Sequence, residues 1–232
     1  MDSVTQLKRY VEESNFDLKE ISQEFNDWKN SLIIYRFALE EIKTKLKILN
    51  EEFQFIHNRN PIEHMKSRIK DPKGIMLKLQ RKGLDVTVDN AKKHIHDIAG
   101  VRITCSFIAD IYDIYKVLEK QDDIKVVKVK DYITNPKPNG YKSLHLIIKI
   151  PVFLSTGMEE VFVEIQIRTI AMDFWASLEH KIYYKFDKEV PQHLLDELKE
   201  AADAAHGLDI KMEKIKDRVD IHRTIGQSTT LI

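Results

Sequence analysis

Apolar residues recur at helical spacing along the first quarter of the chain. Within residues 30–57 they stand three or four positions apart, at 34, 38, 42, 46, 49, 53 and 56. This spacing places them on one face of a helix. A stretch upstream repeats the spacing with Leu18, Ile21, Phe25 and Trp28. We therefore expect a shorter helix followed by a longer one, which together form an N-terminal helical hairpin or arm.

The middle of the chain carries the patterns of strands and short helices. Runs rich in β-branched residues, which are typical of strands, cover residues 100–106, 124–130, 144–150 and 161–167. Helical patterns cover residues 75–82, 108–120, 170–186 and 191–219. The order of these elements predicts an α+β fold, with a mixed sheet of four or five strands flanked by helices. We expect helical extensions at 1–60 and 189–232 around a core at 61–188, and the C-terminal extension to serve in oligomerisation.

Composition excludes several classes of protein. With 43% hydrophobic residues the chain can bury a core, which excludes global disorder. No apolar run approaches the ~18 residues that cross a membrane. The single cysteine, Cys105, cannot form an internal disulfide. We therefore expect a cytoplasmic protein in a reducing compartment.

Charge is balanced overall, with 37 basic and 37 acidic residues, but it is not evenly distributed. Residues 64–82 hold seven basic residues and one acidic residue, and residues 125–149 hold six lysines and one aspartate. Such basic blocks favour an anion-binding site. The alternative is that these lysines merely solvate the surfaces of helices and strands.

Two clusters suit the binding of a nucleoside triphosphate. Arg68 and Lys70, followed by Lys78, could clamp phosphates in a flexible loop, and an arginine can also stack on a purine. Asp97 stands where a helix ends and a strand begins, which suits Mg²⁺ held against phosphates. The alternatives for Asp97 are a helix cap, a salt bridge to Arg102, or a transition-metal site shared with His94 and His96.

Two further clusters suit a second nucleotide. The Pro- and Gly-containing loop 135–145 presents Tyr141 for stacking on a base, and its lysines for phosphates. Its polar candidates are Lys137, Lys142 and His145. The alternative is a hairpin loop whose tyrosine packs on the core.

The strand at 161–167 places Glu164, Gln166 and Arg168 on one face, where Glu164 could bind Mg²⁺ or accept a proton from a hydroxyl. The alternative for Glu164 is a cross-strand ion pair with Lys142 or Lys149. Taken together, separated carboxylates, a stacking aromatic residue and two cationic clamps are what phosphoryl transfer between two nucleotides requires.

Three segments resemble the synthetase domain of the RelA/SpoT alarmone synthetases. They are HDIAGVR at 96–102, NPKPNGYKSLH at 135–145 and EIQIRT at 164–169, and the resemblance covers about residues 40–190. The chain is similar to the stand-alone small synthetases of this family. The resemblance implies a nucleotidyltransferase-like fold and transfer of the β,γ-pyrophosphoryl group of ATP to the 3′-hydroxyl of GDP or GTP, giving AMP and (p)ppGpp. It also implies Mg²⁺ as the cofactor and a homotetramer.

The resemblance also implies residue roles. On the ATP side Arg68 and Arg102 would sandwich the adenine, with Lys70 and Lys78 on the phosphates and Asp97 on Mg²⁺. On the guanosine side Tyr141 would stack on guanine, and Glu164 would activate the 3′-hydroxyl or share the metal. The remaining guanosine-side residues would be Lys137, Lys142, His145, Gln166 and Arg168. One departure is Gly74, which stands where small members often have a serine.

Other functions fit the same residues. A nucleic-acid-binding module, most simply one for RNA, would use the basic clusters, and its affinity would fall steeply with salt. A regulator that binds nucleotides without turnover and a nucleotidyltransferase that moves AMP are the other candidates. The sequence does not distinguish GDP, GTP or GMP as acceptor.

Overall fold

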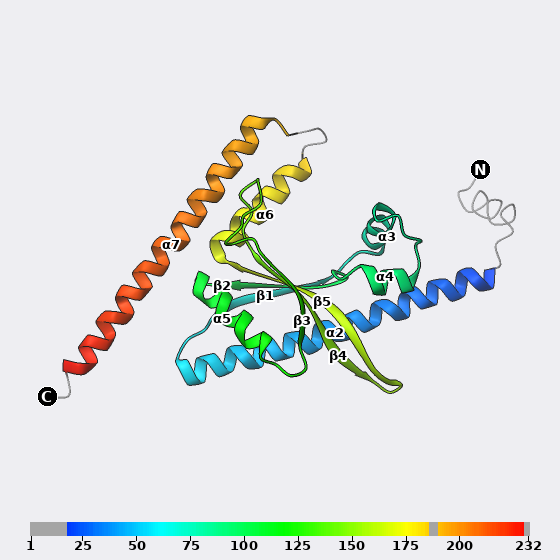
Figure 1. Ribbon diagram of the computed structural model, residues 1–232, viewed down its shortest axis with the longest axis horizontal. Coiled ribbons are helices and arrows are strands. Elements are labelled where there is room, and N and C mark those ends of the chain that lie inside the picture. Colours follow the sequence, from blue (N-terminus) through cyan, green and yellow to red (C-terminus); the bar gives the residue numbers. More distant parts are fainter. Residues whose placement is uncertain (1–17, 186–189, 230–232) are drawn as a thin grey trace.

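The computed structural model describes residues 18–185 and 190–229 (Figure 1). Its central element is one five-stranded sheet of order β1-β2-β5-β4-β3. The strands are β1 (Ile62–Ile69), β2 (Ala99–Cys105), β3 (Lys125–Asp131), β4 (Leu144–Leu154) and β5 (Gly157–Thr169). Only the β2–β5 pair is parallel, and the other three pairs are antiparallel. The predicted α+β class with a mixed sheet is thus confirmed.

Helices cover one face of the sheet and surround the other. They are α2 (Leu18–His57), α3 (Pro72–Arg81), α4 (Val88–His94), α5 (Ile108–Glu119), α6 (Ile170–Lys185) and α7 (Gln192–Thr229). Helices α2 and α5 pack against the sheet, and α4 contacts both α2 and α3. In Figure 1, α6 lies at one end of the sheet and α3 and α4 lie at the other. Between these two ends one face of the sheet has a stretch that no helix of the described residues covers, and we call it the open face.

The prediction of two N-terminal helices is wrong, because α2 is continuous from Leu18 to His57. Its apolar stripe from Ile34 to Leu49 is buried and belongs to the same core as the sheet. Residues 1–17 of the predicted extension lie outside the described residues. The boundary placed at residue 60 stays a prediction, although α2 shares its core with the sheet.

Strand β1 is the strand that the sequence pattern did not predict. It forms an edge of the sheet, and most of its residues are exposed, so it lacks the apolar signature of a buried strand. Its register on β2 pairs Lys66 with Arg102 and Arg68 with Gly100. Arg68 therefore stands on a strand and not in the flexible loop that was expected.

The C-terminal half follows the predicted pattern with longer elements. Strands β4 and β5 form a hairpin, and its turn at residues 155–156 lies between the predicted strands 144–150 and 161–167. Helix α7 continues to Thr229, beyond the predicted end at Val219, and runs antiparallel to α6 before extending past the sheet (Figure 1). In the described part of the chain, no helix is both long and apolar enough to cross a membrane.

Candidate active site

The alternation of side chains along β5 determines which residues point toward the open face. Along β5 the apolar residues Val163, Ile165 and Ile167 are buried against the helices, and Glu164 and Gln166 point the other way. The register places Gly100 beside Glu164 and Arg102 beside Gln166 on β2. On β4 it places His145 beside Gln166. The predicted polar face of this strand is thereby confirmed.

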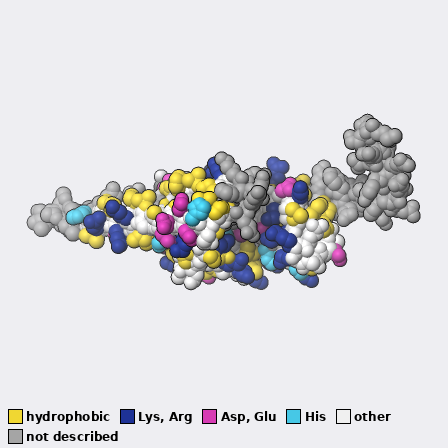
Figure 2. Space-filling view, turned by 90° about the horizontal axis from the view of Figure 1, so that it is seen from above, with side chains coloured by type: hydrophobic (Ala, Val, Ile, Leu, Met, Phe, Trp, Pro, Cys, Tyr) yellow, Lys and Arg dark blue, Asp and Glu magenta, His cyan; other side chains and the backbone are white. Residues whose placement is uncertain are grey.

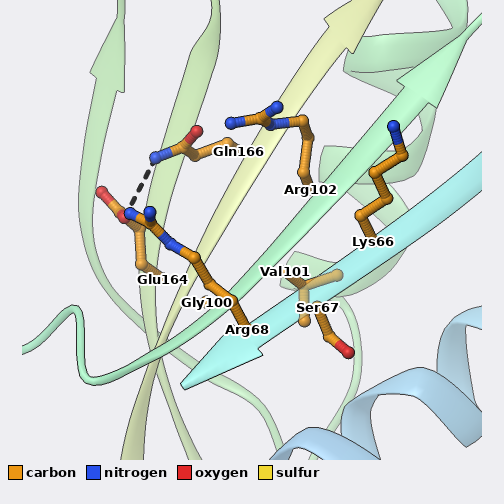
Figure 3. Close-up of a pocket in the computed structure, with 8 residues that line it drawn as sticks. All are labelled: Lys66, Ser67, Arg68, Gly100, Val101, Arg102, Glu164 and Gln166. Carbon is orange, nitrogen blue, oxygen red and sulfur yellow. Dashed lines mark hydrogen bonds between the residues drawn. The ribbon is translucent and has the colours of Figure 1, made fainter. Parts of the chain in front are cut away.

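A pocket of about 200 Å³ opens on this face and is lined by residues of β1, β2 and β5. Arg68 and Arg102 border it together with Glu164 and Gln166 (Figure 3). Gly100, Val101, Lys66 and Ser67 complete its lining. The two arginines predicted to hold adenine therefore share one cavity with the predicted catalytic carboxylate.

Asp97 joins the two predicted phosphate lysines at the edge of this face. Its Oδ2 lies 3.0 Å from Lys70 Nζ and 2.8 Å from Lys78 Nζ. Burial raises the pKa of Asp97, but hydrogen bonds and charge from Lys78 and Lys70 outweigh it, so the net pKa lies below the usual range. The Oδ1 atom is buried and has no hydrogen-bond partner among the described residues.

The alternatives for Asp97 are contradicted where the structure tests them. Arg102 does not pair with Asp97, because its Nη1 lies 3.3 Å from Asp173 Oδ1. His96 stacks on Phe162 with ring centroids 3.9 Å apart. No group of three or more metal-binding side chains occurs among the described residues, which argues against a transition-metal site with His94 and His96.

Glu164 belongs to a closed ring of side-chain hydrogen bonds. Its Oε1 lies 3.5 Å from His145 Nδ1, and its Oε2 accepts from Gln166 Nε2 at 3.1 Å. Arg168 donates to Gln166 Oε1 at 3.2 Å and to the Tyr141 hydroxyl at 2.7 Å. The same hydroxyl lies 2.7 Å from His145 Nε2, which closes the ring.

The ring keeps Glu164 ionised. Burial raises its pKa, but the hydrogen bond and charge of His145 and the hydrogen bond from Gln166 outweigh burial, so the pKa lies below the ordinary glutamate value. The alternative ion pairs do not form, because Lys149 pairs with Glu160 and Lys142 with Asp203. Glu164 is thus an anionic acceptor that faces the open side of the sheet.

The loop 135–143 delivers an aromatic platform beside Glu164. Lys137 Nζ lies 4.8 Å from the ring centroid of Tyr141 and 5.0 Å from that of Tyr132. Tyr132 also meets the ring of His145 edge-on, with centroids 5.2 Å apart. Tyr141 is half-buried and packs on a small core cluster of Trp175, Ala176 and Ala202. The predicted alternative, a loop whose tyrosine packs on the core, is therefore confirmed for this residue.

Lys142 is the predicted site residue that the structure does not bring to the others. Its side chain is 8% exposed, and its Nζ lies 3.7 Å from Asp203 Oδ1 on α7. The Lys142 side chain points toward the C-terminal helix α7, whereas the hydroxyl of the neighbouring Tyr141 takes part in the ring of hydrogen bonds with His145 and Arg168.

Known proteins of similar sequence and fold identify the family. Residues 67–189, more than half of the chain, match the family described as a region found in RelA/SpoT proteins. The chain belongs to the RelA/SpoT family. It is 59% identical to the GTP pyrophosphokinase YwaC of Bacillus subtilis, over 88% of this chain and 96% of that one.

Solved structures agree with this RelA/SpoT assignment. The small alarmone synthetase 2 of Bacillus subtilis superposes with a TM-score of 0.76 at 58% identity, covering 83% of this chain and 99% of that one. The small alarmone synthetase 1 of the same organism, bound to its product pppGpp, gives a TM-score of 0.76 at 38% identity. That match covers 83% of this chain and 97% of the other.

Two residues of this RelA/SpoT site were missed from the sequence. Asp173 Oδ1 accepts from Arg168 Nη1 at 3.0 Å and also lies near Arg102, so it holds two predicted site arginines. Asp173 lies in the first turn of α6, and the sequence pattern there gives no sign that its carboxylate contacts two arginines. Lys66 lines the pocket beside Arg68, and a period of two would have linked them had 62–69 been predicted as a strand.

Proposed function

We propose that the chain is a (p)ppGpp synthetase, which transfers the β,γ-pyrophosphoryl group of ATP to the 3′-hydroxyl of GDP or GTP. The observation that carries the proposal is the position of Glu164. Its carboxylate lies between the pocket of Arg68 and Arg102 and the loop that holds Tyr141. Two nucleotides bound on these two sides would meet at Glu164. Membership of the RelA/SpoT family supports the same reaction.

On the donor side, Arg68 and Arg102 would hold adenine between their planar guanidinium groups. Lys70 and Lys78 would bind the phosphates, since both ammonium groups already converge on Asp97. Arg102 keeps its orientation through Asp173. Catalysis of phosphoryl transfer consists largely of such positioning and charge neutralisation.

On the acceptor side, guanine would stack on Tyr141, and Lys137 and His145 would meet the phosphates. Gln166 and Arg168 would support the site through the ring of hydrogen bonds that includes Glu164. Lys142 remains a prediction from the sequence alone, and its contact with Asp203 speaks for a different role.

Asp97 and Glu164 fit Mg²⁺. The buried Oδ1 of Asp97 has no hydrogen-bond partner among the described residues, and the negative charge of Asp97 acts on Glu164. Magnesium in proteins is commonly held by one or two carboxylates together with substrate phosphates. Bound there, Mg²⁺ would neutralise charge on the phosphate oxygens and help to align the two substrates.

The chain's own residues would then move one proton. The 3′-hydroxyl oxygen attacks the β-phosphorus of ATP, and the bond from that phosphorus to the α–β bridging oxygen breaks, so AMP leaves. Glu164 accepts the hydroxyl proton, and its lowered pKa keeps it in the required ionised form. General-base assistance of this kind contributes about 10²–10⁴-fold to a rate.

We also propose a homotetramer in the cytoplasm. Helix α6 exposes a row of apolar residues at four-residue spacing: Ile170, Phe174, Leu178 and Ile182. Hydrophobic side chains gather over the part of the molecule where α6 and α7 lie (Figure 2). A contiguous apolar surface of this kind is typical of protein–protein contact. The buried free thiol of Cys105 suits a reducing compartment.

Product analysis tests the proposed reaction. Purified protein is incubated with ATP, Mg²⁺ and either GDP or GTP, and the nucleotides are separated by ion exchange. We expect AMP in equal amount with a guanosine nucleotide that carries two additional phosphates. Formation of ADP or free pyrophosphate would contradict the proposal. Nucleotide binding without turnover would favour the regulator, and salt-sensitive RNA binding without turnover would favour the nucleic-acid module.

A further inference from the structure

The loop that carries Tyr141 is pressed against the C-terminal helix α7. Gly140 is buried and has a φ of +86°, a conformation that favours glycine. A Cβ atom at this position would lie 2.6 Å from the Cβ of Ala202 and 3.6 Å from the Cα of Lys199. The backbone of the loop thus touches α7 at a place where neither side has room for a larger side chain.

Polar contacts hold the loop on both sides of Tyr141. Asn139 Nδ2 donates to Glu179 Oε1 on α6 at 3.1 Å. Lys142 is buried with its Nζ 3.7 Å from Asp203 Oδ1 on α7. The ring of Tyr141 packs on the cluster that contains Ala202 and Trp175. With its neighbours held by the two helices, Tyr141 turns toward His145 and Glu164.

Helix α7 is itself anchored to the sheet. The indole nitrogen of Trp175 donates to the Leu198 carbonyl at 2.8 Å, which ties α6 to α7. Thr169, the last residue of β5, donates to buried Asp209 Oδ2 at 2.7 Å. Glu213 Oε1 accepts from the backbone nitrogen of Ala109 on α5 at 2.9 Å. These contacts give α7 a fixed position relative to the strand that carries Glu164.

We propose that α7 is a positioning element of the acceptor site, acting through the contact of Ala202 with Gly140 and the pair of Asp203 with Lys142. Through these two contacts, α7 fixes the position of the Tyr141 ring relative to the sheet and thereby controls the affinity for the guanosine nucleotide. This inference rests on the proposed function. It gives the C-terminal helix a role within one subunit, apart from oligomerisation, and makes Lys142 a positioning residue.

Enlarging Ala202 tests the contact directly. Ala202→Leu should lift the loop, whereas Ala204→Leu is a matched control because Ala204 is exposed on the same helix. We expect Ala202→Leu to raise the KM for GDP at least tenfold relative to Ala204→Leu, with little change in the KM for ATP. Equal acceptor KM values in the two variants, or an equal loss for both substrates, would overturn the inference.

Two milder changes guard against misfolding of Ala202→Leu. Asp203→Asn leaves the loop sequence intact and removes the charge that Asp203 presents to Lys142 and to Lys199 on the surface of α7. It should raise the KM for GDP severalfold, whereas an unchanged KM would overturn the positioning role of Lys142. Gly140→Ala should impair GDP use through both its positive φ and the clash with Ala202, and adding Ala202→Gly should restore the part that is due to the clash, because the opposing Cβ atom is removed. No restoration would contradict the contact.

Hydrogen exchange separates this inference from the proposed function. The Tyr141 amide donates to Asn139 Oδ1 at 3.2 Å and the Gly140 amide to the Lys137 carbonyl at 2.8 Å. Both amides should exchange faster in Ala202→Leu than in Ala204→Leu, whether or not the protein turns over. An inactive wild-type protein would refute the function alone. An active wild-type protein, together with identical amide exchange in the two variants, would refute the positioning role of α7 alone.

Discussion

The hydroxyl oxygen of Tyr141 lies 2.7 Å from Nε2 of His145, and Arg168 donates to the same hydroxyl at 2.7 Å. Because Arg168 can only donate, the Tyr141 proton is free to go to His145 Nε2. In the tautomer that accepts this proton on Nε2, the imidazole carries its own proton on Nδ1, the nitrogen that faces Glu164 at 3.5 Å. The proposed acceptor site thus gives Tyr141 two separable roles, a ring that would stack on guanine and a hydroxyl that orients the imidazole.

The two roles of Tyr141 predict different kinetics for two variants. Tyr141→Ala removes the ring and should raise the KM for GDP about 5- to 150-fold, the range expected from ~1–3 kcal/mol of base stacking. Tyr141→Phe keeps the ring and should mainly lower kcat. Initial rates with GDP varied at saturating ATP measure both effects. An unchanged acceptor KM in Tyr141→Ala would remove Tyr141 from the guanine site.

Glu164→Gln should abolish turnover while ATP binding survives. The amide cannot accept the hydroxyl proton, so we expect kcat to fall by about 10²–10⁴-fold or more. Glu160→Gln is the control, because Glu160 lies on the same strand and pairs with Lys149. Calorimetry with a non-hydrolysable ATP analogue measures the binding. Loss of analogue binding in folded Glu164→Gln would contradict the assigned role.

Asp97→Asn should remove the dependence of donor binding on magnesium. The wild-type carboxylate offers a buried oxygen without a hydrogen-bond partner among the described residues. Asp71→Asn, an exposed change beside Lys70, is the control. We expect Mg²⁺ to strengthen binding of the ATP analogue in Asp71→Asn but not in Asp97→Asn. Equal strengthening in both variants would place the metal elsewhere.

Tyr35 predicts how the stability of the fold depends on alkaline pH. Burial between α2 and the sheet, assisted by the charge of Glu159, raises the pKa of Tyr35 to about 12. Between pH 10 and 12 the folded state therefore holds a proton that the unfolded state has lost, and stability falls as pH rises. The loss from this group is about 1.4 kcal/mol per pH unit. Urea titrations at several pH values measure the free energy of unfolding, and in Tyr35→Phe this free energy should fall less steeply between pH 10 and 12 than in the wild type. An identical dependence on pH in both proteins would contradict the assignment to Tyr35.

The sequence predicted best where one face of an element is buried. The alternation around Glu164 was correct because one side of β5 lies on the core and the other on the open face. Strand β1 was missed because its only β-branched residues, Ile62 and Ile69, stand at its two ends, whereas the other exposed edge strand, β3, contains three valines. The predicted break between the helix that contains Trp28 and the helix at 30–57 was wrong, because the continuity of a helix depends on the surface that α2 packs against and not on the spacing of apolar residues alone.

The site was predictable in its residues but not in their partners. Local motifs identified Asp97, Tyr141 and Glu164, because each stands at a strand end, a turn or an alternating face. The pairings that orient them join distant segments, as when Asp173 meets Arg102 or Asp203 meets Lys142. Such pairs depend on how α6 and α7 return to the sheet, and the spacing of residues within one segment carries no information about that path.

The fate of the β-phosphate of ATP tests pyrophosphoryl transfer most directly. ATP labelled on its β-phosphate is incubated with the protein, Mg²⁺ and GDP, with Glu164→Gln as the inactive reference. We predict that the label moves to the 3′ position of the guanosine nucleotide and that the AMP formed is unlabelled. Label retained in ADP, or released as free pyrophosphate, would contradict the proposed reaction.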